Sequence, residues 1–322
     1  MNRRFISQGL LACALAAATL AFPQSFPTRP IRVIVPFPAG GTMDSVVRPL
    51  GQEMAKVLGQ PFVIENKPGA STVVGVVAAA KSAPDGYTVV GIANSFTLNA
   101  TLQADLPYDT IKDFRPIGFM ARTPAVLVGN PRLPAKDLRE LIAYSKANPG
   151  KLSYATPGTG TGQHLAGEML KMTSGIDMVH VPYKGVGPAL NDLLGGQIDL
   201  VFGNLPDLLP QIRAGKAKSF GVASLQRATL APDLPTIAEQ GYPGFEASTW
   251  MGLMAPAGVS DQVVARLHGE LVRALAIPEI RSSLEARGLE PMAGTPEEFG
   301  AFIKSEIAKN ARVIKEANIK LD

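Results

Sequence analysis

The sequence predicts an α/β fold in which mostly parallel sheets are flanked by helices. From Pro30 onward, short apolar runs alternate with amphipathic segments, which is the pattern of strands joined by crossover helices. A strand, a Gly-rich loop and a helix follow one another near the start of the chain and again near its middle. With 322 residues, 46% of them hydrophobic and only 18% charged, the chain can bury the core of two domains or one large one. A disordered chain is excluded.

The first unit begins with an apolar strand over 31–35, followed by a loop over 36–41. The next apolar residues recur at the spacing of one helical face: Val47, Leu50, Met54 and Leu58. Gly59 ends this helix, and a second strand follows over 62–65. A Pro-Asp-Gly turn then precedes a third strand over 88–93.

The second unit follows a helix that carries Leu138, Leu141 and Ile142 and ends near Pro149. Its strand covers 152–155, its loop 156–162, and its helix carries Leu165, Met169 and Met172. Further strands are predicted over 178–181, 198–202, 219–223 and 245–255. The tail is helical: Ser260 caps one helix that Pro278 ends, and Thr295 with Glu298 forms the capping box of another.

Residues 1–22 have the composition of a secretory signal peptide. Arg3 and Arg4 precede an uncharged run that is too short to span a bilayer, and Thr19 and Ala21 supply the small residues of a cleavage site. A lipoprotein or twin-arginine signal is the alternative, but the apolar run before Cys13 is too short for the first. Cys13 is the only cysteine, so the exported chain has neither a thiol nor a disulfide.

Charge argues against nucleic acid as a partner. The chain has 31 Lys and Arg against 27 Asp and Glu, and loss of the two leader arginines leaves 29 against 27, or +2. The basic residues are scattered singly among acids, whereas a nucleic-acid binder gathers them into a patch.

The Gly-rich loops are the strongest candidates for a binding site. A strand that feeds a helix leaves unpaired N–H groups and the positive end of the helix dipole at the edge of the sheet, where an anion binds without arginine. Glycines let a ligand approach the backbone, and threonines add hydroxyl donors. The residues concerned are Gly40, Gly41, Gly158, Gly160 and Gly162, with Thr156, Thr159 and Thr161. Tight turns alone would explain either loop, but two such loops favour an interdomain cleft.

Other polar residues follow strands or open helices and reach the same crevice. Asp44 opens the first helix, where a carboxylate either organises the loop or contacts the ligand. His164 either bonds the second loop or contacts the ligand, and Lys184 is either solvated or paired with an acidic ligand. Asn94, Ser95 and Asn204 also follow predicted strands, so we expect them to reach the crevice as well.

Catalytic and cofactor motifs are missing from the sequence. Neither loop spells G-x-G-x-x-G, although Glu65 keeps a nicotinamide-binding alternative open. The nearest match to a nucleophile elbow, around Ser71, lacks its final glycine, and the three histidines lack metal-binding spacing. We therefore expect no enzyme, no cofactor and no metal, with an exported hydrolase as a further alternative.

Several motifs resemble one known family over the whole exported chain. They occur in this order: 27–32 (PTRPIR), 35–41 (VPFPAGG) with Asp44, 65–70 (ENKPGA), 84–87 (PDGY), 106–109 (LPYD), 112–114 (KDF), 180–185 (HVPYKG), 235–236 (PT), 243–246 (PGFE) and 255–258 (APAG). By these motifs the chain resembles the Bug solute-binding receptors of bacterial tripartite tricarboxylate transporters. The resemblance implies a periplasmic two-domain binding protein of the type II-like, Venus flytrap architecture.

The resemblance also implies where the ligand lies. In the family, a ligand carboxylate is held between the first Gly loop and a threonine-rich loop of the second domain. Carried over, these loops are Phe37, Pro38, Ala39, Gly40 and Gly41 on one side and residues 156–161 on the other. Ser71 and Thr72 stand where family members often have two glycines, so the ligand stays open among di-, tri- and aromatic carboxylates.

We therefore expect two domains joined by two long crossing strands, one formed by 27–127 with 245–322 and the other by 128–244. Carboxylate binding would bias a hinge equilibrium between open and closed forms. The expected partners are the carboxylate and the membrane permease subunits of a tripartite tricarboxylate transporter, and we expect the receptor to be a monomer. A sensor that feeds a signalling partner is the alternative role.

Overall fold

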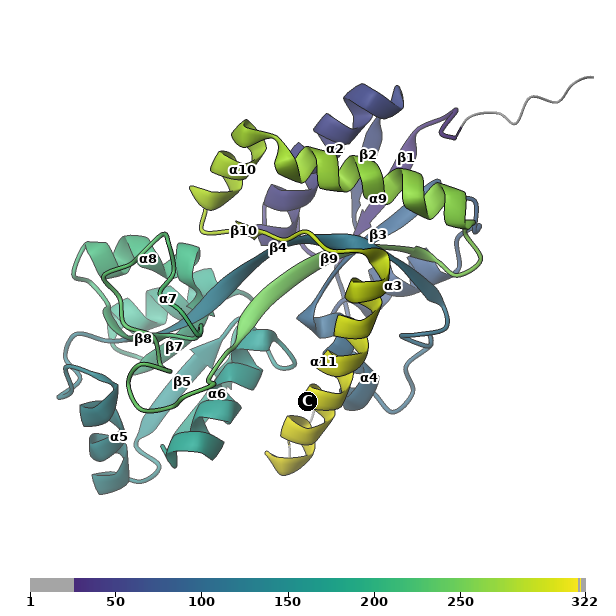
Figure 1. The fold of residues 1–322 in the computed structure, drawn as a ribbon. Coiled ribbons are helices and arrows are strands. Elements are labelled where there is room, and N and C mark those ends of the chain that lie inside the picture. Colours follow the sequence, from purple (N-terminus) through teal and green to yellow (C-terminus); the bar gives the residue numbers. More distant parts are fainter. Residues whose placement is uncertain (1–25, 318, 320–322) are drawn as a thin grey trace, which may run out of the picture.

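The structure is a computed structural model that describes residues 26–317 and 319 (Figure 1). The predicted signal peptide over 1–22 lies outside the described residues. The strands are β1 (Ile31–Val35), β2 (Phe62–Asn66), β3 (Thr88–Ala93), β4 (Phe114–Gly129), β5 (Leu152–Thr156), β6 (Met178–Pro182), β7 (Leu200–Asn204), β8 (Lys218–Val222), β9 (Ser248–Pro256) and β10 (Glu290–Pro291). The helices are α2 (Thr42–Leu58), α3 (Val73–Ala80), α4 (Asn94–Leu102), α5 (Leu138–Ala147), α6 (Gly162–Ser174), α7 (Val186–Gly195), α8 (Leu205–Arg213), α9 (Asp261–Ala276), α10 (Pro278–Glu285) and α11 (Pro296–Glu316).

Two long strands connect the two halves of the molecule. The strand order is β2-β1-β3-β9-β4-β7-β5-β6, and the pairs around β1 and β5 are parallel. In contrast, β4 pairs antiparallel with β9 along residues 114–124 and with β7 along 125–129. We call the half built on β1, β2 and β3 lobe A and the half built on β5, β6 and β7 lobe B. β4 and β9 run from one lobe into the other, and we call these two connecting strands the hinge (Figure 1).

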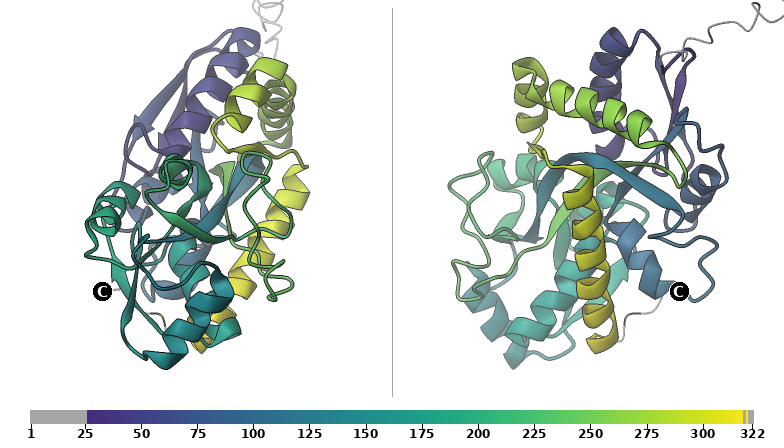
Figure 2. Two further views of the ribbon diagram at one scale, coloured as in Figure 1. Left: turned by 90° about the vertical axis from the view of Figure 1, so that its left-hand side faces the viewer. Right: turned by 45° about the vertical axis from the view of Figure 1, so that its right-hand side comes forward.

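Helices cover both faces of the sheet in each lobe, as the alternation of apolar residues requires. In lobe A, Ile31 and Val33 pack with α2, α9 and α10 on one face, while Ile34 packs with α3, α4 and α11 on the other. In lobe B, α5 and α6 cover one face, and α7 and α8 the other. Figure 2 shows these layers from two sides. The predicted α/β class, with mostly parallel strands flanked by helices, is confirmed.

The predicted local structure agrees with the structure at its strongest signals. Gly59 ends α2 in the left-handed conformation, Ser260 caps α9, and Thr295 and Glu298 form a capping box on α11. The interpretation of 245–255 as one strand is wrong at its start, because β9 begins at Ser248 after a turn. Within the described residues, no helix is long and apolar enough to cross a membrane.

The position of β4 had no clear signal in the sequence. Pro116 and Pro124 interrupt its apolar pattern, and prolines argue against a central strand because they cannot donate a ladder hydrogen bond. The structure accommodates Pro116 at a shift in the register between β4 and β9, just before Gly118. Only the pairing with β9 along 114–124 and with β7 and β8 beyond it makes this segment a regular strand.

Candidate ligand-binding site

A cleft with a volume of about 1470 Å³ lies between the lobes. Both Gly-rich loops line it, together with the ends of β3, β7 and β9. Most of the predicted site residues line this cleft: Phe37, Pro38, Ala39, Gly40, Gly41, Asn94, Ser95, Gly158, Thr159, Thr161, Lys184 and Asn204. Asp44, Thr156, Gly160 and His164 are not among the lining residues, and the contacts below place them behind it.

The first loop presents the start of α2 to the cleft. Gly41 is the N-cap of α2, has an extended backbone and provides no side-chain cap. The N–H groups of the first helical turn therefore have no acceptor within the helix or from a cap. Thr42 and Met43, which carry two of them, line the cleft. Gly40 has a φ of 78°, in the left-handed region that favours glycine.

Asp44 holds this loop from behind. Its buried carboxylate accepts hydrogen bonds from the Gly40 N–H at 3.0 Å, from Arg48 Nε at 2.7 Å and from Asn66 Nδ2 at 2.9 Å. Burial raises the pKa of the Asp44 carboxyl, but these three bonds and the charge of Arg48 outweigh it and leave the pKa below its ordinary value. Asn66 Nδ2 also reaches the carbonyl of Phe37 at 3.1 Å. These contacts indicate that Asp44 holds the first loop in place.

The second loop presents the start of α6 from the opposite lobe. Thr161 is the N-cap of α6; its hydroxyl accepts the His164 N–H and donates to the Gly158 carbonyl at 2.8 Å. The Gly160 N–H donates to His164 Nδ1 at 3.3 Å. The side chain of Thr156 is fully buried and contacts His180 Nε2 at 2.7 Å. Gly158, Thr159 and Thr161 thus face the cleft on a support of buried polar contacts.

A pair of stacked histidines lies within this support. The rings of His164 and His180 are 3.8 Å apart between centroids and nearly parallel, and Tyr154 packs against His180. Burial, the neighbouring His164 and the charge of Lys171 lower the pKa of His180 to about 3. The second loop therefore rests on a neutral His180 at any pH near 7. Sequence reasoning gave His180 no role here, because only the pairing of β5 with β6 brings it under Thr156.

The floor of the cleft is a hydrogen-bonded junction between the lobes and the hinge. Asn94, at the end of β3, donates to the Ser248 carbonyl at 3.0 Å and accepts the Trp250 N–H at 3.1 Å. Both ends of its amide thus hold β9 in place. Asn204 Oδ1 accepts from Gln163 at 2.6 Å and from Thr249 at 2.8 Å.

No hydrogen bond joins the Asn204 amide nitrogen to another described residue, and Asn204 lines the cleft. Gln163 and Thr249 also line the cleft but were missed from the sequence. The only sequence signal for Gln163 was its position directly after the threonine loop.

A third loop, residues 68–71, lines the cleft beside Ser95. Three consecutive non-glycine residues there are in the left-handed region, with φ values of 45° at Ala70, 50° at Ser71 and 80° at Thr72. Such residues cost of order 1–3 kcal/mol each and persist only where neighbours hold them. Here the Thr72 and Ser95 hydroxyls contact each other at 3.1 Å, and Asn99 donates to the Ser71 carbonyl at 2.8 Å. The sequence prediction named no ligand-binding residue in this loop, although Ser71 and Thr72 depart there from the family pattern.

Few charges face the cleft. The charged residues that line it are Asp105, Lys184 and Asp207. The described residues also contain no cluster of three or more histidine, cysteine or acidic side chains placed to hold a metal ion. Recognition of an anion would therefore depend on N–H groups, hydroxyls and one lysine.

Two α/β lobes, hinged by crossing strands around an open cleft, define a two-domain solute-binding protein. Comparison with known proteins gives the family. Residues 46–319 match the model of the tripartite tricarboxylate transporter family receptor. This chain belongs to that receptor family, which includes the Bug proteins and whose members are periplasmic binding proteins and not enzymes.

Individual relatives are similar over almost the full chain. BugT of Bordetella pertussis is 38% identical over 95% of this chain and 96% of its own length. The structure of the periplasmic binding protein BugD has a TM-score of 0.81 at 36% identity, covering 92% of this chain and all of BugD. A structure from R. palustris, solved with adipate, has a TM-score of 0.84 at 33% identity, with 92% and 100% coverage.

Proposed function

We propose that this receptor binds a small di-, tri- or aromatic carboxylate between its two Gly-rich loops and delivers it to the membrane permease subunits of a tripartite tricarboxylate transporter. The observation that carries the proposal is that the uncapped start of α2 and the loop before α6 line one cleft from opposite lobes. A carboxylate between them would accept N–H bonds from lobe A and hydroxyl or N–H bonds from lobe B. Ligand binding would thereby favour the closed form.

The magnitudes show that the helix ends cannot supply all of the affinity. Each helix dipole contributes ~0.3–2 kcal/mol, whereas micromolar binding requires about 8 kcal/mol. Hydrogen bonds and apolar burial must provide the remainder. Phe37, Met43, Leu102 and Met251 line the cleft and offer apolar surface for the carbon chain of the ligand.

Lys184 is the candidate partner of a second carboxylate. It is the only basic residue among those lining the cleft, where it follows the end of β6. The family structure solved with adipate shows that a six-carbon dicarboxylate is accepted by a relative of this chain. A dicarboxylate with one end at the two loops and the other at Lys184 fits this charge distribution. We propose that the chain is exported to the periplasm by a signal peptide over 1–22 and acts there as a monomer.

The test is a thermal-shift panel on the chain from residue 23 onward. The probes are malate, adipate, citrate and terephthalate, with the corresponding alcohols or amides as controls that lack the carboxylate. We expect one or more acids to stabilise the folded protein, by about 2.7 kcal/mol at a hundred times the dissociation constant. No stabilisation by any acid, or equal stabilisation by an uncharged control, would contradict the proposal.

A further inference from the structure

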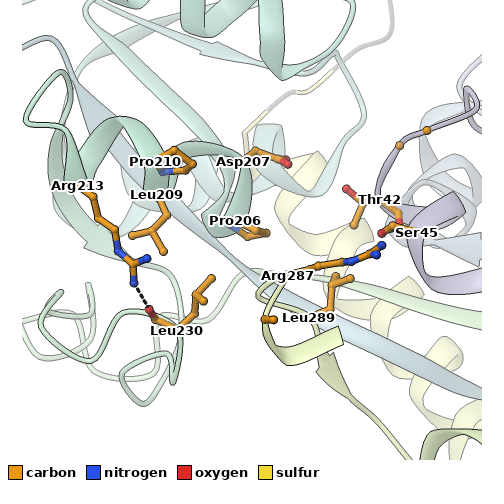
Figure 3. Close-up of a pocket in the computed structure, with 13 residues that line it drawn as sticks. Thr42, Ser45, Pro206, Asp207, Leu209, Pro210, Arg213, Leu230, Arg287 and Leu289 are labelled. Carbon is orange, nitrogen blue, oxygen red and sulfur yellow. Dashed lines mark hydrogen bonds between the residues drawn. The ribbon is translucent and has the colours of Figure 1, made fainter. Parts of the chain in front are cut away.

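A second hollow, which we call the side groove, opens from the ligand cleft between the lobes. Its volume is about 610 Å³. It shares Gly40, Gly41, Thr42 and Asp207 with the cleft. One wall is α8 of lobe B, and the other is the start of α2 with residues 286–289 of lobe A (Figure 3). Because both hollows have one wall on each lobe and share residues of α2 and α8, a motion about β4 and β9 that brings the start of α2 toward α8 narrows both.

The lobes already touch at one end of the side groove. Gly288 has a φ of 69°, and a Cβ at this position would lie 2.7 Å from the Leu230 side chain and 3.1 Å from Pro206 Cβ. The absence of a side chain thus lets lobe A approach lobe B here. Asp207 and Arg287 are the immediate chain neighbours of Pro206 and Gly288. Their backbones therefore lie close to this contact between the lobes, and both residues line the groove.

Asp207 and Arg287 carry opposite charges, and both side chains lack a charged partner among the described residues. Neither side chain forms an ion pair or a hydrogen bond with any described residue. By contrast, Arg213, the other arginine of the groove, donates to the Leu230 carbonyl at 2.9 Å. In Figure 3, Asp207 extends from α8 toward Thr42 and Arg287 extends toward Ser45, so both charged ends face the first turn of α2.

The surroundings of Asp207 favour a cationic partner. The surrounding protein partly desolvates its carboxyl and so raises the pKa, with no nearby cation to counter the effect. A guanidinium that arrived on closure would offset this penalty by its charge.

We infer that Asp207 and Arg287 form an interlobe ion pair when the receptor closes, so that they act as positioning residues that increase ligand affinity through closure. The inference rests on the proposed receptor function, because it requires closure. The pair would contribute only in the closed form, and a contact present in only one of two states shifts their equilibrium in favour of that state. Exposed ion pairs are typically worth ~0.2–1 kcal/mol, which corresponds to an affinity change of up to about fivefold.

A double-mutant cycle tests the pair. The variants are Asp207→Arg, Arg287→Asp and the exchanged double variant, measured by calorimetry with whichever of malate, adipate, citrate and terephthalate binds the wild type most tightly. We expect each single variant to bind about two- to fivefold more weakly, because it places like charges in the groove. The double variant should recover affinity to within twofold, and 1 M NaCl should reduce all differences. Arg213→Asp is the matched control: a charge reversal in the same groove that no change at Asp207 should rescue.

A second readout follows closure without requiring a ligand. Residues 23–322 contain no cysteine, so dyes can be placed at Lys56→Cys in lobe A and Lys136→Cys in lobe B, both highly exposed positions. Single-molecule energy transfer should show a smaller closed population in each single variant, and the wild-type population again in the exchanged one. Two results would contradict the ion pair. One is that the losses of closed population in the single variants add up in the exchanged variant with no recovery, and the other is that the single variants keep the wild-type closed population. If the wild type binds no acid, the proposed function fails, but this measurement still decides whether the charges couple.

Discussion

The two loops that face the cleft reach the same geometry by different chemistry. In lobe A, the carboxylate of Asp44 accepts hydrogen bonds from the Gly40 N–H, Arg48 and Asn66. In lobe B, uncharged groups support the loop, with Thr156 on His180 and the Gly160 N–H on His164. One helix start is thus held by an ionic network and the other by a neutral one. The comparison teaches that the two halves of the site should respond differently to substitution and to pH.

The largest expected effect on carboxylate affinity comes from a bulky side chain in the first loop, in front of the N–H groups of α2. Gly41→Val places a branched side chain on a cleft-lining residue whose φ of −78° accepts any L residue. Its Cβ would lie 3.3 Å from the Pro38 carbonyl oxygen, so the loop must shift by a few tenths of an ångström, and the side chain would obstruct the α2 N–H groups. We expect at least a hundredfold loss of carboxylate affinity by calorimetry with only a modest fall in Tm, because valine is a poorer N-cap than glycine.

The matched control is Gly269→Val on α9, where a Cβ meets no atom within 4 Å. It makes the same substitution away from the cleft and should leave affinity unchanged. Normal carboxylate binding by Gly41→Val would place the site elsewhere.

A smaller effect is expected from disabling the ionic support in lobe A. Asp44→Ala removes the acceptor of three hydrogen bonds, leaving the Gly40 N–H and the Asn66 amide without this partner. The loss should be about 1–3 kcal/mol in the free energy of unfolding, with roughly tenfold weaker binding from the loosened loop. Urea unfolding and calorimetry measure the two quantities. Unchanged stability would show that the first loop does not depend on this carboxylate.

The smallest effect is a difference in pH dependence between the loops. The pKa of His180 is lower in the folded protein than in the unfolded chain, so the unfolded chain binds the proton more readily. Stability from this group is complete above about pH 6.5 and declines toward the folded pKa of about 3. Asp44, whose pKa is lowered from 3.8, contributes in full above that value and loses its contribution as the pH falls from there through its folded pKa.

Urea unfolding at pH 7 and pH 5 should therefore isolate the lobe B support. One proton corresponds to 1.36 kcal/mol per pH unit, so the wild type should lose at most ~2 kcal/mol through His180 over this interval. His180→Gln should lose correspondingly less. Equal losses in the wild type and in His180→Gln would contradict the role assigned to His180.

The sequence predicted the regular elements and the two loops better than the residues that join them. Strands such as β1 and β5 are short, apolar and bounded by glycine or proline, so local pattern was sufficient. Thr249 carries no local signal for a shared site, and Gln163 has only its position after the threonine loop. Both line the cleft because β4 and β9 connect the lobes, and β9 pairs with both β3 and β4, which lie far from it in sequence.

The same limit applies to the roles of individual candidates. The sequence left Asp44 and His164 open between loop support and ligand contact, because both alternatives require the same residue types near a helix start. Three-dimensional contacts are needed to separate them: the Asp44 oxygens are occupied by Gly40, Arg48 and Asn66, and His164 Nδ1 is occupied by Gly160. The domain boundaries and the ligand-binding roles of the cleft residues stay predictions.

The most direct test of the central claim is a crystal structure of the receptor with the carboxylate that stabilises it most. The account predicts one carboxylate group between the lobes, within about 2.7–3.2 Å of N–H groups in the first turn of α2 and of donors in the 158–161 loop. A ligand carboxylate that contacts neither loop, or only one of them, would contradict it.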